Sequence, residues 1–359
     1  MHPSPGGEHT AMAIALEDYG QNQAPTEFDA FPGGSSLLRQ AFRHRGLPES
    51  SLKIMLSSLS PGTLKQYNTT YKGWWKFCLE YHLDAYSASV PQVLQFLTEK
   101  YESSAGYSTL NTDRSALSLL VNTKIGSDDR ISRFLKGVYR LRPPRPRYSE
   151  TWDPTKVLEY LTSWPDNQDL SLENLTKKLA ILLALATAQR VQTLSLIKID
   201  NIQKTQSKII IHITDIIKTS VVTKTQPVIH LPFFTQNPKI CPSRALQAYL
   251  DRTTSVRNGE SYLWLTYKKP YKKASKQTIS RWIKDMMQHS GIDISKYTAH
   301  STRHTATSSA KRTGVSMELI RKAAGWSLNS NVFAKYYNIP ISDDTPQENF
   351  AYAALSSNS

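Results

Sequence analysis

Apolar residues recur every three or four positions between about residues 47 and 141. From residue 61 this stripe runs through Leu64, Tyr67, Tyr71, Trp74, Trp75 and Cys78. A stripe with this period predicts a helix with one buried face. Ser60 followed by Pro61 marks its start, because serine caps a first turn and proline fits its first position. A shorter apolar run predicts a preceding helix over residues 50–59.

Three further stretches of the same period predict helices over residues 91–102, after Ser108 and from Asp128. Several short amphipathic helices joined by short loops are typical of a compact helical domain. We therefore predict an all-α domain over residues 47–141. Cys78 lies on an apolar stripe and is expected in its core.

The second half combines helices with one region of β pattern. Helices are expected after the caps at Asp153-Pro154, Ser171 and Cys241-Pro242 and over residues 278–289. The helix that Ser171 caps is expected to be long and buried and to end at Arg190. Residues 209–213 and 228–231 are β-branched runs around a polar connection with Lys218 and Lys224, and residues 262–265 suggest a further short strand. The predicted fold class is mostly α with a small antiparallel sheet, in an α+β domain over residues 153–340.

Three segments fall outside these two domains. Residues 1–46 are rich in Pro, Gly, Ser and Gln and are expected to form a disordered arm. Residues 142–152 alternate arginines with prolines, which predicts a stiff basic linker suited to a phosphate backbone. An ordinary solvated linker is the alternative. Residues 341–359 form an acidic tail with three apolar side chains near its end.

Composition narrows the classes of function. No apolar run reaches the roughly eighteen residues of a membrane span, and the start lacks the pattern of a secretory signal. Two cysteines, Cys78 and Cys241, are too few for a disulfide framework or a multi-cysteine metal site, which favours a reducing compartment. The chain carries a net charge of +15. Residues 47–340 alone hold 41 basic and 21 acidic residues, a net charge of +20 that favours a polyanionic partner.

Residues 300–337 gather side chains suited to phosphodiester chemistry: His300, Arg303, Trp326 and the pair Tyr336-Tyr337. A tyrosine with a pKa of about 10 needs a base before it can attack phosphorus. His300 and Arg303, one helical turn apart, can provide that base and a fork of donors for phosphate oxygens. Each motif alone is compatible with ordinary packing.

Two upstream residues complete a chemically sufficient set. Arg190, at the end of the buried helix, can pair with Arg303 around the negative charge of a five-coordinate phosphorus. Lys218, on the polar connection, can protonate the leaving oxygen. Trp326 adds an indole N–H donor. This chemistry requires no metal ion, and acidic residues are scarce in these segments.

The order Arg190, Lys218, His300-x-x-Arg303, Trp326 and tyrosine resembles the tyrosine recombinase (phage integrase) family over about residues 48–340. Four finer motifs resemble recombinases of DIRS-like retrotransposons and Cryptons: residues 189–194, Cys241-Pro242, residues 324–327 and residues 333–338. The resemblance implies that these six residues form an active site. It also implies a 3′-phosphotyrosine intermediate, strand exchange without ATP or cofactor, and a two-domain clamp on DNA with a helical core-binding domain.

The resemblance further implies double-stranded DNA as a partner, self-association as a dimer or tetramer on DNA, no membrane, and work in the nucleus. The tail over residues 341–359 is expected to dock on a neighbouring protomer. Candidate phosphate contacts are basic side chains of the first long helix, the linker, the polar connection and a later loop. They are Lys65, Lys72, Lys76, Arg142, Arg145, Arg147, Lys224, Lys268, Lys269, Lys272, Lys273 and Lys276.

Two features depart from the family pattern. Thr193 stands where many members carry an acidic residue, three positions after the first arginine. Tyr336 and Tyr337 lie ten and eleven residues after Trp326, a longer spacing than is common in the family. We predict Tyr337 as the nucleophile, with Tyr336 as the alternative. A non-catalytic DNA-binding protein and a type IB topoisomerase-like enzyme remain the alternative functions.

Overall fold

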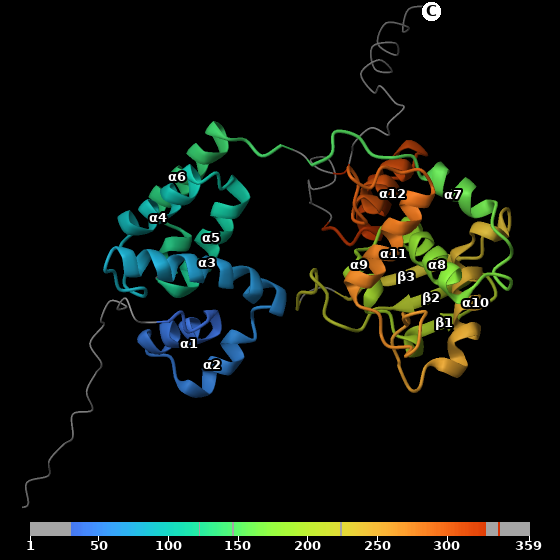
Figure 1. The fold of residues 1–359 in the computed structure, drawn as a ribbon, viewed down its shortest axis with the longest axis horizontal. Helices are drawn as coiled ribbons and strands as arrows, with labels where there is room; N and C mark the ends of the chain where they lie inside the picture. The colour runs from blue at the N-terminus through green and yellow to red at the C-terminus, as the bar shows by residue number, and fades with distance from the viewer. Residues whose placement is uncertain (1–29, 122, 146, 223–224, 328–336, 338–359) are drawn as a thin grey trace, which may run out of the picture. The chain divides into compact units, whose positions relative to one another are not determined.

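The computed structural model describes residues 30–121, 123–145, 147–222, 225–327 and 337. The chain divides into two compact units, Met1–Arg145 and Pro146–Ser359, each with its own hydrophobic core (Figure 1). Their boundary falls within residues 142–152, the stretch expected to be a linker. Within the described ranges, no helix has both the length and the apolar character needed to cross a membrane.

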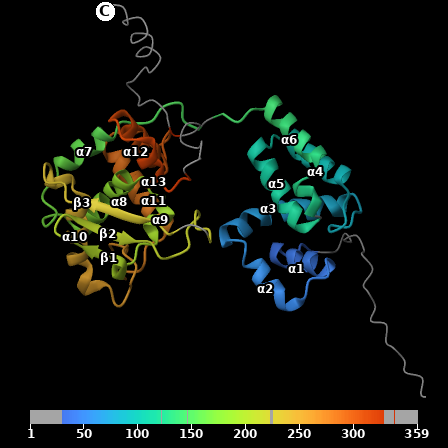
Figure 2. The ribbon, with the colours of Figure 1, turned by 180° about the vertical axis from the view of Figure 1, so that it is seen from behind.

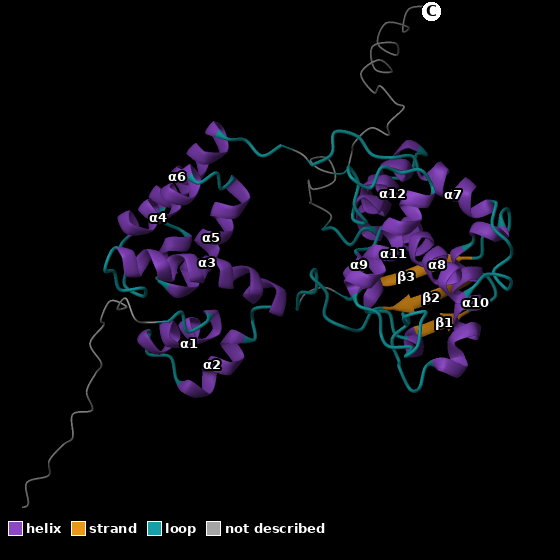
Figure 3. Ribbon diagram, in the orientation of Figure 1, coloured by secondary structure: helices purple, strands orange, loops and turns teal. Residues whose placement is uncertain are grey.

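The described residues of the first unit form helices joined by loops, with no strand among them (Figure 3). They are α1 (Gly34–His44), α2 (Glu49–Leu56), α3 (Pro61–Glu80), α4 (Val90–Glu102), α5 (Tyr107–Leu120), the short 3-10 helix η1 (Thr123–Gly126) and α6 (Asp129–Leu141). The predicted start of α3 is confirmed: the Ser60 hydroxyl accepts a hydrogen bond from the Thr63 backbone N–H at 3.1 Å. Asp128 caps α6 through the Arg130 N–H in the same way.

The core of this unit is built around an aromatic cluster. Trp74, Phe77 and Phe96 lie with ring centroids 5.2–5.4 Å apart. Among the described residues of this unit, Asp113 is the one acidic residue that is buried, and its carboxylate has two polar partners. The Thr70 hydroxyl and the Lys100 ammonium each lie 2.6 Å from its carboxylate, which satisfies a charge that burial would otherwise destabilise.

The disordered arm expected over residues 1–46 is wrong at its C-terminal end, where the chain forms a helix. Residues 34–44 form α1, whose Leu37, Leu38 and Ala41 are buried in the core of the first unit. Three apolar side chains on one helical face explain the difference, because burying them stabilises a segment whose composition resembles a flexible one. Residues 1–29 lie outside the described residues.

The second unit surrounds one buried helix, α8 (Leu172–Thr187), which packs against α10, α11 and α12 (Figure 2). Its other helices are α7 (Pro154–Thr162), α9 (Val191–Ser195), α10 (Pro242–Thr253), α11 (Lys276–His289), α12 (Ser301–Arg312) and α13 (Met317–Ala323). Three short 3-10 helices complete them: η2 (Ile199–Asn201), η3 (Pro238–Ile240) and η4 (Thr254–Val256). The predicted caps at Asp153 and Ser171 are confirmed.

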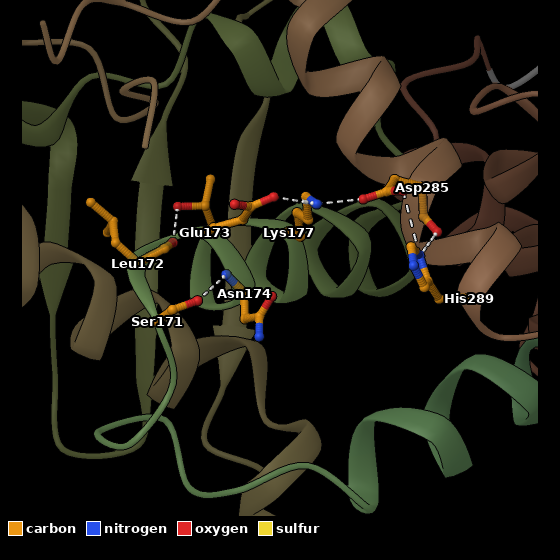
Figure 4. A network of polar contacts seen from close by, with 8 residues as sticks. Ser171, Leu172, Glu173, Asn174, Lys177, Asp285 and His289 are labelled. Carbon is orange, nitrogen blue, oxygen red and sulfur yellow. Dashed lines mark hydrogen bonds and ion pairs between the residues drawn. The ribbon is translucent and has the colours of Figure 1, made fainter. Parts of the chain in front are cut away.

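The start of α8 is fastened to α11 by a network of charges (Figure 4). Lys177 lies 2.7 Å from Glu173 on its own helix and 2.5 Å from Asp285 on α11. His289, one turn after Asp285, contacts that residue in turn. The network fixes the N-terminal half of α8, and the C-terminal end of the same helix leads directly into Arg190.

A three-stranded antiparallel sheet of order β1-β2-β3 covers part of this core, formed by β1 (Ile202–Lys204), β2 (Lys208–His212) and β3 (Val228–Pro232). Ile209 pairs with Leu231 and Ile211 with Ile229, and all four side chains are buried on one face. The expected strand over residues 262–265 is wrong: Tyr262 and Leu265 form only isolated bridges, with Lys198 and Lys273.

The expected linker also ends earlier than residue 152. Tyr148, Thr151 and Trp152 are buried in the second unit. The Trp152 indole N–H donates to the Ser301 hydroxyl at 2.8 Å, and the Thr151 and Thr305 hydroxyls lie 2.6 Å apart. Two large aromatic side chains after the last proline gain more from burial than from an extended linker. They brace α12, which carries several buried polar residues.

Candidate active site

The first turn of α12 presents two of the predicted residues. His300 is the N-cap residue of this helix, and its carbonyl accepts a hydrogen bond from the Arg303 backbone N–H at 3.1 Å. The His300 side chain keeps an exposed side, whereas only 1% of Arg303 is exposed. One helical turn therefore places a solvent-accessible imidazole beside a fully buried guanidinium.

Tyr337 lies in contact with this turn. Its hydroxyl is 3.0 Å from His300 Nε2, and its backbone carbonyl accepts a hydrogen bond from the Ser308 hydroxyl at 2.6 Å. The ring stacks on His304 with a centroid separation of 4.1 Å and packs against Trp326 at 4.7 Å. These contacts hold Tyr337 with its hydroxyl close to an imidazole nitrogen.

Arg303 joins the ends of two helices at this point. Its two terminal nitrogens donate to the backbone carbonyls of Ala188, after α8, and Ala324, after α13, at 2.6 and 2.5 Å. The guanidinium carbon lies 4.6 Å from the Trp326 ring centroid and 5.6 Å from that of Tyr337. Its Nε has no hydrogen-bond partner in the described part of the chain. Arg303 thus braces the site with two of its five N–H donors.

The end of α8 turns sharply at Ala188, which has the left-handed φ of 50°. This conformation is uncommon for a residue with a Cβ and is stabilised here by neighbouring contacts. Besides the Ala188 carbonyl bond from Arg303, the Gln189 side-chain amide donates to the Ala323 carbonyl at 2.7 Å. The turn delivers Arg190 as the half-buried N-cap residue of α9.

The charges around His300 favour its neutral form. Burial of part of the ring lowers its pKa to about 4, and the positive charges of Arg303 and Arg190 act in the same direction. Lys218 and Arg147 contribute further. Arg190 and Lys218 thus both add to the positive potential around His300. A neutral imidazole at pH 7 can accept a proton from a tyrosine hydroxyl.

Burial similarly lowers the pKa of Arg303 to about 10, with Arg190 acting in the same direction and Tyr337 in the opposite one. Two arginines within electrostatic reach of each other concentrate positive charge here, and neither forms an ion pair with a carboxylate in the part of the chain that the structure describes. Thr193, at the position of the absent acid, is buried with 1% of its surface exposed. Such a cluster is suited to a doubly charged phosphate.

Three contributing side chains were not predicted from the sequence. His304, which stacks on Tyr337, could have been found by its helical spacing of four from His300. Gln189 and Ser308 bind backbone carbonyls distant in sequence. Such acceptors leave no signal in a single sequence, because every residue carries a carbonyl.

The candidate DNA contacts differ in how free they are. Lys65, Lys72, Lys76, Arg145, Arg147, Lys268, Lys269, Lys272 and Lys276 are exposed. Arg142 is also exposed but is used in the fold: it donates to the carbonyls of Tyr101 and Ala105 and lies over the Tyr101 ring at 4.2 Å. The ammonium of Lys273 lies 3.0 Å from the Tyr262 ring centroid. Lys224, Tyr336 and residues 341–359 lie outside the described residues.

The model of the phage integrase family matches residues 155–340, slightly more than half of the chain. The chain belongs to the phage integrase family. The matched segment begins in α7 and runs past Tyr337, so it contains all six predicted site residues. No curated protein matches the chain in sequence.

Solved structures of tyrosine recombinases share the fold. The site-specific recombinase XerH bound to its difH substrate is 12% identical, with a TM-score of 0.52, and covers 92% of this chain and 99% of its own. The Tn1549 transposon integrase in complex with circular intermediate DNA is 15% identical, with a TM-score of 0.51 and coverages of 89% and 99%. A lambda integrase dimer bound to a core site is 16% identical, with a TM-score of 0.51 and coverages of 82% and 94%.

Proposed function

We propose that this phage integrase family member is a DNA recombinase of a mobile element, which cleaves and rejoins strands through Tyr337. The observation that carries the proposal is the 3.0 Å contact between the Tyr337 hydroxyl and His300 Nε2, beside the buried guanidinium of Arg303. The resemblance of four short motifs to DIRS-like and Crypton recombinases supports the mobile-element origin and, with it, a nuclear site of action.

The first step is attack of the Tyr337 oxygen on a DNA phosphorus. His300 takes the phenolic proton while the new oxygen–phosphorus bond forms and the bond to the 5′-oxygen breaks. Lys218 gives its proton to that leaving oxygen. The products are a 3′-phosphotyrosine and a free 5′-hydroxyl. Attack by the 5′-hydroxyl of another strand reverses these transfers and reseals DNA, so the bond energy is conserved and no ATP is needed.

Arg303 and Arg190 stabilise the five-coordinate phosphorus. Two of the five N–H donors of Arg303 bind backbone carbonyls, so its remaining N–H groups and those of Arg190 are the donors we assign to the phosphate oxygens. The residues in these roles require no metal ion and no cofactor. Trp326 closes one side of the site by packing on both Arg303 and Tyr337.

Double-stranded DNA is the proposed partner, gripped by the helical unit and the catalytic unit as a clamp. The net charge of +20 over residues 47–340 and the exposed lysines of α3 and of residues 268–276 support this assignment. Related folds include a lambda integrase dimer bound to a core site. We therefore propose assembly of two or four protomers on DNA, with residues 341–359 docking on a neighbour.

Covalent trapping tests the proposal. The substrate is a labelled duplex with the terminal sequence of the element and a nick close to the cleavage site. After cleavage, the short piece with the free 5′-hydroxyl diffuses away, so the rest of the labelled DNA should stay attached to the wild-type chain. Tyr337→Phe should abolish attachment, and Tyr336→Phe is the matched control that should retain it. Attachment that survives in Tyr337→Phe and disappears in Tyr336→Phe would reassign the nucleophile.

The two alternative functions give different results in the same system. A DNA-binding protein without catalysis would bind the duplex and give no covalent adduct with any variant. A type IB topoisomerase-like enzyme would relax supercoils as a monomer without recombinant products. Removal of residues 341–359 should weaken assembly on DNA more than binding of one protomer, and equal losses would contradict the docking role.

A further inference from the structure

The connection between β2 and β3 carries Lys218 on a turn with its own hydrogen bonds. The Ser220 backbone N–H donates to the Ile217 carbonyl at 2.9 Å, and the Ser220 hydroxyl accepts from the Ile217 N–H at the same distance. That hydroxyl also donates to the Gln226 side chain at 2.9 Å. Ile217 is buried while Lys218 is exposed. The turn thus has a fixed apolar anchor on the residue before the lysine.

A second anchor lies three residues before Lys218. The carboxylate of Asp215 is 2.6 Å from the Lys198 ammonium through one oxygen and accepts a hydrogen bond from the Tyr262 hydroxyl at 2.8 Å through the other. Lys198 and Tyr262 are themselves paired through their backbones as an antiparallel bridge. Both oxygens of Asp215 are therefore bound to a preformed part of the fold.

The surrounding charges keep this anchor ionised. The hydrogen bond from Lys198 lowers the pKa of Asp215, the Tyr262 hydroxyl acts in the same direction, and the charges of Lys198 and Lys273 add to the effect. The ammonium of Lys273 lies over the Tyr262 ring. Because Asp215 already has a cation of its own, it does not capture Lys218, which forms no ion pair within the described residues.

A further bond ties the same connection to the same support. The Asn201 side-chain amide, at the end of η2, donates to the Thr214 hydroxyl at 3.0 Å. Three residues of chain reach at most about 10 Å, so fixing Asp215 limits where the Lys218 backbone can lie. Lys198 follows Arg190 by eight residues through α9, so the anchor belongs to the same body as the first catalytic arginine.

We propose that Asp215, held by Lys198 and Tyr262, is a positioning residue that places Lys218 for proton transfer to the leaving 5′-oxygen. This rests on the proposed function, in which Lys218 is the general acid. A misplacement of about 1 Å can lower a reaction rate by about 100-fold, and loss of a general acid lowers it by about 10²–10⁴-fold. Asp215→Asn should therefore slow cleavage by roughly 10- to 100-fold, less than Lys218→Ala.

Two substrates separate positioning of the acid from a general structural defect. One duplex carries the normal phosphodiester at the cleavage site, and the other carries sulfur in place of the bridging 5′-oxygen. A thiolate leaves without needing a proton, so cleavage of the sulfur substrate does not require the acid. Lys218→Ala, Asp215→Asn and Tyr262→Phe should all be slow on the oxygen substrate and close to wild type on the sulfur substrate.

The control is Asp200→Asn, which removes one negative charge near Lys198 without touching the connection that carries Lys218. It should behave as wild type on both substrates. Equal defects of Asp215→Asn and Tyr262→Phe on the two substrates, or normal cleavage of the oxygen substrate by both, would overturn the proposal. Failure of the wild type to form any adduct on either substrate would instead refute the proposed function.

Discussion

Lys178 offers a quantitative test of the core that supports Arg190. It lies on α8 with 0% of its surface exposed, and its Nζ has no hydrogen-bond partner among the described residues. Burial, followed by the charge of Lys239, lowers its pKa from 10.5 to about 8. Lys178→Met retains the length of the side chain and removes the charge.

The size and pH dependence of the effect follow from that pKa. The lowered pKa corresponds to a decrease of roughly 3 kcal/mol in the free energy of unfolding at pH 7, because the folded state must then bury a charged ammonium. Between about pH 8 and 10.5 the unfolded chain binds more protons than the folded chain, so wild-type stability rises with pH there. Lys178→Met should be more stable by about 3 kcal/mol at pH 7, and the difference should shrink as pH approaches 10.5.

Urea denaturation of the full chain, followed by hydrogen exchange of α8 peptides at pH 7 and pH 9.5, measures this difference in the catalytic unit. Lys177→Met is the matched control, because the adjacent lysine forms ion pairs with Glu173 and Asp285 and its loss should destabilise the same helix. The reasoning is refuted if Lys178→Met destabilises the unit at pH 7 or gains equally at both pH values. DNA cleavage should be unchanged in Lys178→Met.

Three further predictions concern the site and its charge. In the free protein, NMR should give a titration midpoint below about 5 for the imidazole of His300. Because the unfolded chain then binds the proton more tightly, the free energy of unfolding should fall as pH drops from 6.5 toward about 4. A midpoint near 6.5 would contradict the lowering of this pKa by burial and by the neighbouring positive charges. Arg303→Lys should lower both cleavage, by about 100-fold, and the unfolding midpoint, because a lysine cannot bind both carbonyls and a phosphate; loss of cleavage at unchanged stability would contradict the bracing role. If about ten phosphates are contacted, a plot of the logarithm of DNA affinity against the logarithm of salt concentration should have a slope near −9. Lys268→Ala should reduce the size of this slope by about 1. A slope near zero would contradict the basic clamp.

Local signals in the sequence predicted much of the fold. Caps such as Ser60 and Ser171 act within one turn of a helix, so their effect is visible in a few residues. The position of α1, the burial of Trp152 and the absence of a strand at Tyr262 depend on partners far along the chain. Single-sequence patterns carry little information about such contacts, which decide whether an ambiguous segment packs or stays extended.

The candidate site shows the same division. The residue types and their order predicted which side chains to examine, including His300 and Tyr337. They did not predict that Arg303 would bind the carbonyls of Ala188 and Ala324, nor that His304 would stack on the tyrosine ring. These contacts arise because α8, α12 and α13 meet at one point, which is a property of tertiary packing.

The most direct test of the account identifies the residue that becomes attached to DNA. Trypsin cleaves after Lys335, and residues 336–359 contain neither lysine nor arginine, so Tyr336, Tyr337 and Tyr352 fall in one tryptic peptide. Trapped complexes are digested with nuclease and trypsin, and the peptide is fragmented in a mass spectrometer. The account predicts a 3′-linked nucleotide on Tyr337; a nucleotide on either other tyrosine, or no modified peptide from a productive reaction, would contradict it.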